Sequence, residues 1–284
     1  MATLNISALA QRTGVAADTL RKWEQRYGIL QPTRTAGGQR RYDESDVARV
    51  EWLKARLREG YRISEAAALL GDATAPVHAT PAELREALLE AVGRADANAI
   101  ARLLDQAFTV QSLESALVDV VQPTLEAVGA RWAEGAFNVA QEHLFSVGVR
   151  ARLERLLADA RGGVRGVAVL ACAPGERHEL GLMMLAVLLR ADGWQVAYLG
   201  AETPYADALA LAERVGARVL AISAASRERV QELEREARQE KRPPAVELLV
   251  GGAGVERADA ERLGARYVNR DLKRAVRTMR GLSR

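Results

Sequence analysis

A histidine between two acidic residues follows a long apolar run in the second half of the chain. The run covers residues 164–173, and Glu176, His178, Glu179 and Gly181 come after it. A neutral imidazole is a good ligand for a transition metal, and a carboxylate two residues away can accept its other ring N–H and raise its donor strength. Because only one protein ligand is offered, the loop favours a metal already held by a macrocycle, with His178 as the ligand and Glu176 behind it.

Two further apolar runs end in small residues. Ser223 and Ala225 stand at the end of one run, and Gly251 and Gly252 directly follow the next. If the runs are parallel strands, ligands bind beyond their carboxyl ends, where these segments would meet the histidine loop. Small residues there predict a slot in which another group approaches the backbone closely. The alternative is that the glycines only turn the chain into its next helix.

A third set of residues lies earlier, in a stretch with helical spacing. Val139, Glu142 and His143 fall within one helical turn and share a face, and Trp132 precedes them. On their own, such residues are more typical of a core aromatic and a buried neutral histidine.

The N-terminal segment concentrates positive charge. Six cations and a single acid, Glu24, lie between Arg21 and Arg41, although the net charge of the whole chain is only +3. A first helix that ends at Gly14 and a second that begins at Ala17 have helix-turn-helix spacing. In such a motif the second helix enters the major groove of DNA.

Outward side chains of the second helix and of a following hairpin are the candidate DNA contacts. Leu20 and Trp23 would pack inward, which leaves the neighbouring cations and hydroxyls free to reach phosphates and base edges. Two glycines between basic flanks then permit a tight turn, typical of a β-wing that presses on the DNA backbone. The candidates are Thr19, Arg21, Lys22, Arg26, Arg34, Thr35, Gly38, Arg40, Arg41 and Tyr42. An ordinary helical domain with a solvated basic face is the alternative.

Three regimes of composition divide the chain into predicted domains 1–75, 76–161 and 162–284. The first ends in a polar, proline-containing linker at 71–76, the second is rich in Leu and Ala at helical spacing, and the third alternates apolar runs with amphipathic helices. The predicted fold class is multidomain α and α/β, with a winged helix-turn-helix, a four-helix bundle and a doubly wound, Rossmann-like parallel sheet. The predicted bundle helices are 81–94, 96–108, 110–130 and 138–160, and the predicted strands are Val164–Ala173, Val196–Leu199, Val219–Ala224, Glu247–Val250 and Arg266–Val268.

Composition argues against several classes of protein. No apolar stretch reaches the ~18 residues that a membrane span needs, and the N-terminus lacks the pattern of a signal peptide, so we expect a cytoplasmic protein with no membrane partner. The lone Cys172 excludes an internal disulfide and any site with several thiolates. No additional catalytic domain is apparent, and we therefore expect no enzyme.

Two of these patterns resemble known families. Residues 19–28, the wing ending at Tyr42 and the helix start at Asp46 resemble the MerR family over roughly residues 4–71. This resemblance implies a winged helix-turn-helix that binds double-stranded operator DNA as a symmetric pair. The residues at the strand ends resemble the cobalamin-binding module of methionine synthase and corrinoid proteins, which implies that His178 is the lower axial ligand of cobalt. The residues that carry this second resemblance are Glu176, His178, Gly181, Ser223, Ala225, Gly251 and Gly252.

The order of the three parts and the spacing of Trp132, Glu142 and His143 resemble the CarH-like light-dependent repressors. The resemblance implies that these residues, with Val139 between them, surround the adenosyl group of adenosylcobalamin. It also implies a homo-oligomer, dimer or tetramer, that represses in the dark and leaves DNA when light breaks the cobalt–carbon bond.

One departure bears on this mechanism. In better-known members a histidine follows the tryptophan and can take the upper cobalt position after photolysis, whereas Ala133 stands there in this chain. His143 is the one plausible replacement, because His78 lies in the linker. The open alternatives are a light-independent sensor of a corrinoid or another tetrapyrrole, a corrinoid methyl-carrier protein, and a regulator that binds no cofactor.

Overall fold

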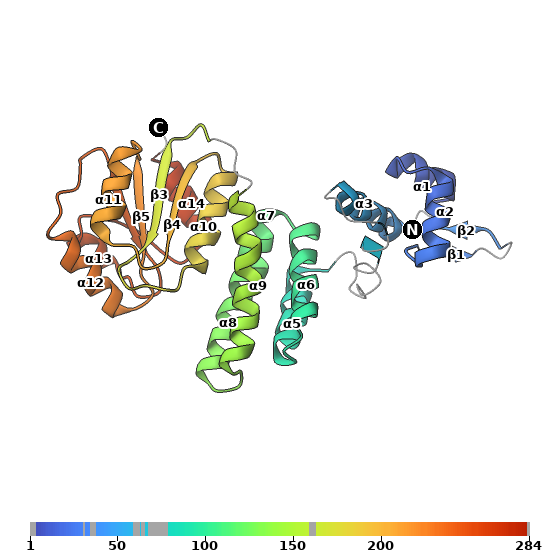
Figure 1. Ribbon diagram of the computed structural model, residues 1–284, viewed down its shortest axis with the longest axis horizontal. Coiled ribbons are helices and arrows are strands. Elements are labelled where there is room, and N and C mark those ends of the chain that lie inside the picture. Colours follow the sequence, from blue (N-terminus) through green and yellow to red (C-terminus); the bar gives the residue numbers. More distant parts are fainter. Residues whose placement is uncertain are drawn as a thin grey trace.

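The computed structural model describes residues 4–30, 32–34, 38–58, 63, 66–67, 79–158 and 163–282. Along the chain, a small helical unit with a hairpin is followed by a group of long helices and then by a sheet with helices on both faces (Figure 1). This architecture confirms the predicted fold class. The predicted linker and His78 lie outside the described residues.

The N-terminal unit comprises α1 (Ile6–Thr13), α2 (Ala17–Tyr27), the antiparallel pair β1 (Thr33–Arg34) and β2 (Arg40–Arg41), and α3 (Glu44–Arg58). The Asn5 side chain caps α1 by accepting a hydrogen bond from the backbone N–H of Ala8 at 2.8 Å. Both α1 and α2 end at a glycine with positive φ, Gly14 and Gly28, a conformation that glycine adopts without strain. The predicted helix boundaries and the wing are therefore confirmed.

The middle unit contains α5 (Pro81–Gly93), α6 (Ala97–Val110), α7 (Leu113–Ser115), η1 (Ala116–Val121), α8 (Gln122–Ala133) and α9 (Val139–Ala158). The predicted helix 110–130 is wrong in one respect, since a π-helical segment, η1, interrupts it. Pro123 gives the physical reason, because it has no N–H for the carbonyl of Asp119 four residues earlier. Arg85 donates to that carbonyl instead, at 2.7 Å.

The C-terminal unit is built on five parallel strands in the order β4-β3-β5-β6-β7. They are β3 (Val167–Cys172), β4 (Gln195–Gly200), β5 (Val219–Ser223), β6 (Glu247–Gly251) and β7 (Arg266–Val268). The predicted number of strands is confirmed, but β3 begins at Val167 and not at Val164, which is 97% exposed. Gly166, with a φ of 116°, turns the chain into the strand.

Helices cover both faces of this sheet. The face covered by α10 (Leu180–Ala191) and α14 (Leu272–Arg280) belongs to the same hydrophobic core as the bundle, whereas α11 (Tyr205–Arg214), α12 (Arg227–Ala237) and α13 (Arg257–Arg262) pack on the other face. Phe145, Val149 and Leu153 of α9 are fully or almost fully buried in the shared core, and α9 packs along α10 (Figure 1). The bundle is thereby joined to the sheet through apolar burial. Among the described residues, no helix has the length and apolar character to cross a membrane.

Candidate functional site

The loop after β3 presents the side chain of His178 to solvent and fixes it from behind. The His178 side chain is 84% exposed, whereas the Glu176 side chain is only 2% exposed, and Nδ1 of His178 lies 2.7 Å from Oε1 of Glu176. Since the carboxylate engages Nδ1, Nε2 is the ring nitrogen that a metal can take. The predicted relation between the two residues is therefore present in the fold.

Glu176 is itself held rigidly by backbone donors. The N–H of His178 donates to Oε1 at 2.8 Å, and the N–H of Ala225, in the loop after β5, donates to Oε2 at 2.7 Å. Burial raises the pKa of Glu176, but these hydrogen bonds and the nearby imidazole outweigh it, so its pKa lies below the ordinary value. The carboxylate is thus an ionised acceptor whose direction is fixed by two loops.

The ends of three neighbouring strands meet at this loop. Cys172 pairs with Ser223, and Ser223 pairs with Gly251, across β3, β5 and β6. At the following position, a Cβ on Gly252 would lie 2.4 Å from the carbonyl oxygen of Ala224. The sequence predicted that another group approaches the backbone closely at Gly252. In the structure that group is the backbone of Ala224 in the same chain. Around Gly181 there is open space, since a Cβ there would meet no atom within 4 Å.

The second predicted set lies where α8 turns into α9. Trp132 is 50% exposed, Val139 is 52% exposed, and the His143 side chain is 68% exposed. Nδ1 of His143 lies 2.6 Å from Oε2 of Glu142. The alternative of a core tryptophan beside a buried histidine is therefore wrong. Large apolar side chains left in solvent near one turn are typical of a surface that covers a ligand or a partner.

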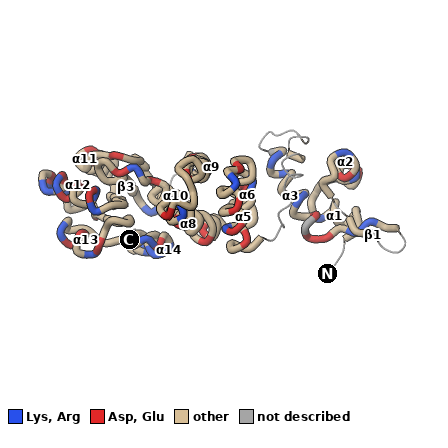
Figure 2. Tube along the Cα trace, turned by 90° about the horizontal axis from the view of Figure 1, so that it is seen from below, with Lys and Arg blue, Asp and Glu red and all other residues tan. Residues whose placement is uncertain are grey.

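The outward face of α2 carries the predicted cations. Leu20 is fully buried and Trp23 is 9% exposed, while Arg21, Lys22 and Arg26 face solvent. Figure 2 shows Lys and Arg positions on α2 and at β1, on the same unit. Thr19 and Arg41 are partly exposed, Arg40 is exposed, and Gly38 has a φ of 76° before β2. Thr35 and the side chain of Arg34 lie outside what the structure describes.

Tyr42 is a correction to the predicted DNA contacts. Its side chain is fully buried, and its hydroxyl donates to Oε2 of Glu24 at 2.8 Å. The other carboxylate oxygen of Glu24 accepts from Nε of Arg40 at 2.7 Å. Sequence reasoning counted Glu24 only as the single acid of a basic segment, but this residue joins α2 to the wing. Tyr42 supports the wing from inside and does not reach outward.

The remaining chemistry of the site agrees with a metal that arrives inside a larger group. Among the described residues, no three His, Cys, Asp or Glu side chains gather closely enough to hold a metal ion. Cys172, below the His178 loop, is buried, and burial raises the pKa of its thiol to about 12, so it stays protonated. A single exposed imidazole with a buried carboxylate behind it fits an axial ligand of a metal complex.

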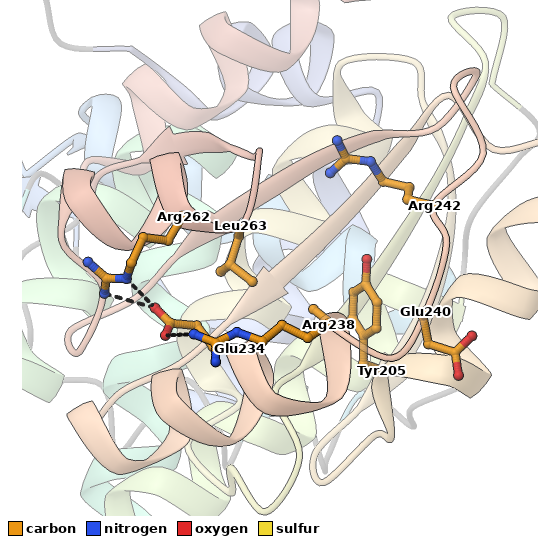
Figure 3. A pocket seen from close by; sticks show the side chains of 8 residues that line it. Tyr205, Glu234, Arg238, Glu240, Arg242, Arg262 and Leu263 are labelled. Atoms are coloured by element: carbon orange, nitrogen blue, oxygen red, sulfur yellow. Dashed lines mark hydrogen bonds and ion pairs between the residues drawn. The ribbon is translucent and has the colours of Figure 1, made fainter.

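A separate pocket of about 250 Å³ lies at α11, α12 and α13 (Figure 3). Its three guanidinium groups already have partners, since Arg262 and Arg238 contact Glu234 at 2.8 and 3.8 Å and Arg242 donates to the carbonyl of Gly264 at 2.7 Å. Arg262 also pairs with Asp259 beside the pocket. We assign no ligand to this pocket.

Comparison with known proteins identifies a family for each half of the chain. A model described as MerR HTH family regulatory protein matches residues 4–72. Models described as B12 binding domain match residues 84–157 and 166–275. The chain therefore joins a DNA-binding regulator of the MerR type to a B12-binding unit, which defines a cobalamin-dependent transcriptional regulator.

Relatives that match most of the chain identify its family within this class. The HTH-type transcriptional repressor CarH of Myxococcus xanthus is 39% identical over 233 residues, which cover 78% of this chain and 76% of CarH. The repressor CarA of the same organism is 38% identical over 229 residues, with the same shares covered. The monomethylamine corrinoid protein of Methanosarcina barkeri has the same fold over 72% of this chain and all of its own, with a TM-score of 0.60 and 18% identity. The chain belongs to the CarH-like family of MerR regulators.

Proposed function

We propose that this chain is an adenosylcobalamin-dependent repressor that binds operator DNA as a homo-oligomer and leaves it in light. The observation that carries the proposal is the exposed His178 ring, whose Nδ1 is fixed by the buried Glu176 and whose Nε2 is available. Membership of a family that includes the repressors CarH and CarA supports it. When bound, adenosylcobalamin supplies a cobalt–carbon bond that light can break.

In this proposal each set of residues has a separate role. His178 would hold the cobalt through Nε2, and Glu176 keeps the ring in the orientation that directs Nε2 outward. The space for the nucleotide tail would be bounded by Gly181, Ser223, Ala225, Gly251 and Gly252. The adenosyl group would be covered by Trp132, Val139, Glu142 and His143.

A change above the cofactor can then reach an interface between subunits. Trp132 and Val139 are about half exposed, and covering an apolar group would remove that surface from water. If the adenosyl group leaves, Trp132 and Val139 would lose their contact with it. The position of the bundle that this contact favours would then be less stable. A shift of the bundle against the sheet would alter a subunit interface and lower the avidity for DNA.

The experiment is size-exclusion chromatography combined with absorption spectroscopy on the chain reconstituted with adenosylcobalamin, in the dark and after green illumination. A light-dependent fall in size with a change of the cobalamin spectrum supports the proposal. The His178→Ala variant should bind less cofactor under the same conditions. Bound cobalamin without any change in size in the light would refute the light response.

A second candidate is a regulator that senses a corrinoid, or another tetrapyrrole, without light. Ala133 favours it, because no imidazole follows Trp132. The other imidazole near Trp132, that of His143, has Nδ1 2.6 Å from Glu142 and Nε2 open, so its contact with Glu142 favours neither candidate. In the same experiment, this candidate predicts bound cobalamin and an oligomer that responds to loading but not to illumination. Turnover of a methyl donor would instead support a methyl carrier, and absence of binding would support a regulator without cofactor.

For DNA, we propose that the exposed and partly exposed cations of α2 and of the wing make the contacts. Arg21, Lys22 and Arg26 lie on the outward face of α2, and Arg40 and Arg41 form β2. We also propose that the three domains keep the predicted limits of 1–75, 76–161 and 162–284. Electrophoretic mobility shifts with operator fragments at increasing salt would test the contacts.

A further inference from the structure

The residue after His178 is a largely buried carboxylate that receives donors from several parts of the fold. Glu179 is 12% exposed, and its Oε1 pairs with Nη1 of Arg150 on α9. Its Oε2 accepts from the hydroxyl of Tyr198 on β4 at 2.7 Å. The backbone of Ala201 donates to the same carboxylate. The bundle, the sheet and the His178 loop are therefore joined at one side chain.

The space around this carboxylate is tightly filled. A Cβ on Gly200 would lie 3.1 Å from Oε2 of Glu179, and Gly200 has a φ of 84°. Burial raises the pKa of Glu179, but the hydrogen bonds from Arg150 and Tyr198 outweigh it and hold the pKa below the ordinary value. In this ion pair the carboxylate of Glu179 is 12% exposed and the guanidinium of Arg150 is 38% exposed, so removing the arginine leaves a largely buried carboxylate without its cation.

The position of Arg150 on α9 connects its contact with Glu179 to the surface that His143 and Val139 form on the same helix. Arg150 follows His143 by seven residues, about two helical turns, and the two side chains therefore share one face of α9. His143 and Val139, in the first turn of α9, belong to the proposed upper surface over the cofactor. Arg150, further along the same face, contacts the residue next to the proposed lower ligand.

We propose that Arg150, Glu179 and Tyr198, here called the Glu179 clamp, position the His178 loop against α9, so that a displacement of α9 changes how strongly His178 holds cobalt. The inference rests on the proposed function, because it requires that His178 binds the cobalt of cobalamin. Glu179 acts through its neighbour and is a positioning residue. The clamp gives the bundle a direct connection to the lower ligand, separate from the apolar core shared by α9 and α10.

The test compares two substitutions on the same helix. Arg150→Met removes the cation of the clamp, and Arg155→Met is the matched control, since Arg155 is exposed and donates to the carbonyl of Ala151 within α9. Each 15N-labelled chain is titrated with hydroxocobalamin, reduced, and examined by electron paramagnetic resonance for the doublet splitting of a 15N nucleus bound to cob(II)alamin, because the 14N base of the cofactor itself would give a triplet. For Arg150→Met we expect about tenfold weaker binding and a reduced fraction of nitrogen-bound cobalt. Arg155→Met should match the wild type.

A second variant and a second measurement guard against a folding defect. Tyr198→Phe keeps the ring and removes one donor to Glu179, and we expect a smaller change in the same direction. Amide hydrogen exchange of residues 177–181 in the cofactor-free chain should be faster in both clamp variants than in Arg155→Met.

The outcomes separate the two proposals. If the wild type shows no nitrogen splitting from His178, both the proposed function and the clamp are wrong. If the wild type shows it and both clamp variants retain wild-type spectra, affinity and exchange, the clamp is refuted while the proposed function stands. Loss of stability alone, with unchanged nitrogen splitting and affinity, would also refute the clamp. A contact that only stabilises the fold predicts that result.

Discussion

Replacing the buried carboxylate behind His178 by an amide tests the geometry of the site directly. In Glu176→Gln the side chain keeps its shape, but one of its two oxygens becomes an NH2 donor. That group must then face either the N–H of Ala225 or the two donors of His178, which now approach at 2.7 to 2.8 Å. Two donors would then face each other, and water cannot accept their hydrogen bonds because the side chain at position 176 is only 2% exposed.

The magnitude follows from the number of donors that lose an acceptor. A buried polar group without a partner costs about 1–3 kcal/mol, and we expect the free energy of unfolding to fall by that amount when at least the Ala225 N–H is left unpaired. Since the partner behind a metal-bound histidine also sets its orientation, we expect cobalamin affinity to fall by roughly 10–100-fold.

Two assays measure these effects separately. Urea unfolding of the cofactor-free chain gives the change in stability, and an absorbance titration with hydroxocobalamin gives the change in affinity. Glu86→Gln, on the exposed face of α5, is the matched control and should change neither quantity. If Glu176→Gln behaves like Glu86→Gln in both assays, Glu176 does not direct the His178 ring and the reasoning is wrong.

Three further predictions concern other parts of the molecule. The pKa of Asp259 lies below its ordinary value because ion pairs and backbone donors outweigh burial. The stability that Asp259 contributes is therefore present above pH ~3.8 and is lost as the pH falls through the folded-state pKa. The acid unfolding curve of Asp259→Asn should be flatter in this pH range. Gly252→Ala should lower stability in urea by about 1–3 kcal/mol, since its Cβ would meet a carbonyl oxygen at 2.4 Å, and by more than Gly216→Ala, which meets nothing within 4 Å. Arg41→Ala should weaken binding to all DNA sequences and reduce the salt slope by about 1, whereas Arg21→Ala should reduce discrimination between operators; equal loss of discrimination in both would contradict the assignment.

Local patterns were sufficient for most elements of secondary structure. Apolar residues at helical spacing located the helices, and the short apolar runs located five strands, because these signals act over a few residues. The two errors arose where a local signal was overridden. Val164 continues an apolar run but stands before Gly166, and Pro123 displaces the hydrogen bonds of a helix without ending it.

The Glu176–His178 pair is predictable without the fold, because a carboxylate two residues from a histidine can reach its ring within one loop. The basic face of α2 is predictable too, since it follows from helical spacing alone. Three other features could be seen only in the folded chain: Tyr42 points into the core, the backbone of one loop fills the space beside Gly252, and Glu179 contacts Arg150. These facts depend on which distant segments pack together, and residues far apart in a sequence carry no local signal of their contact. The loop that offers a metal ligand can therefore be found from sequence, while its connection to the bundle becomes visible only in the folded chain.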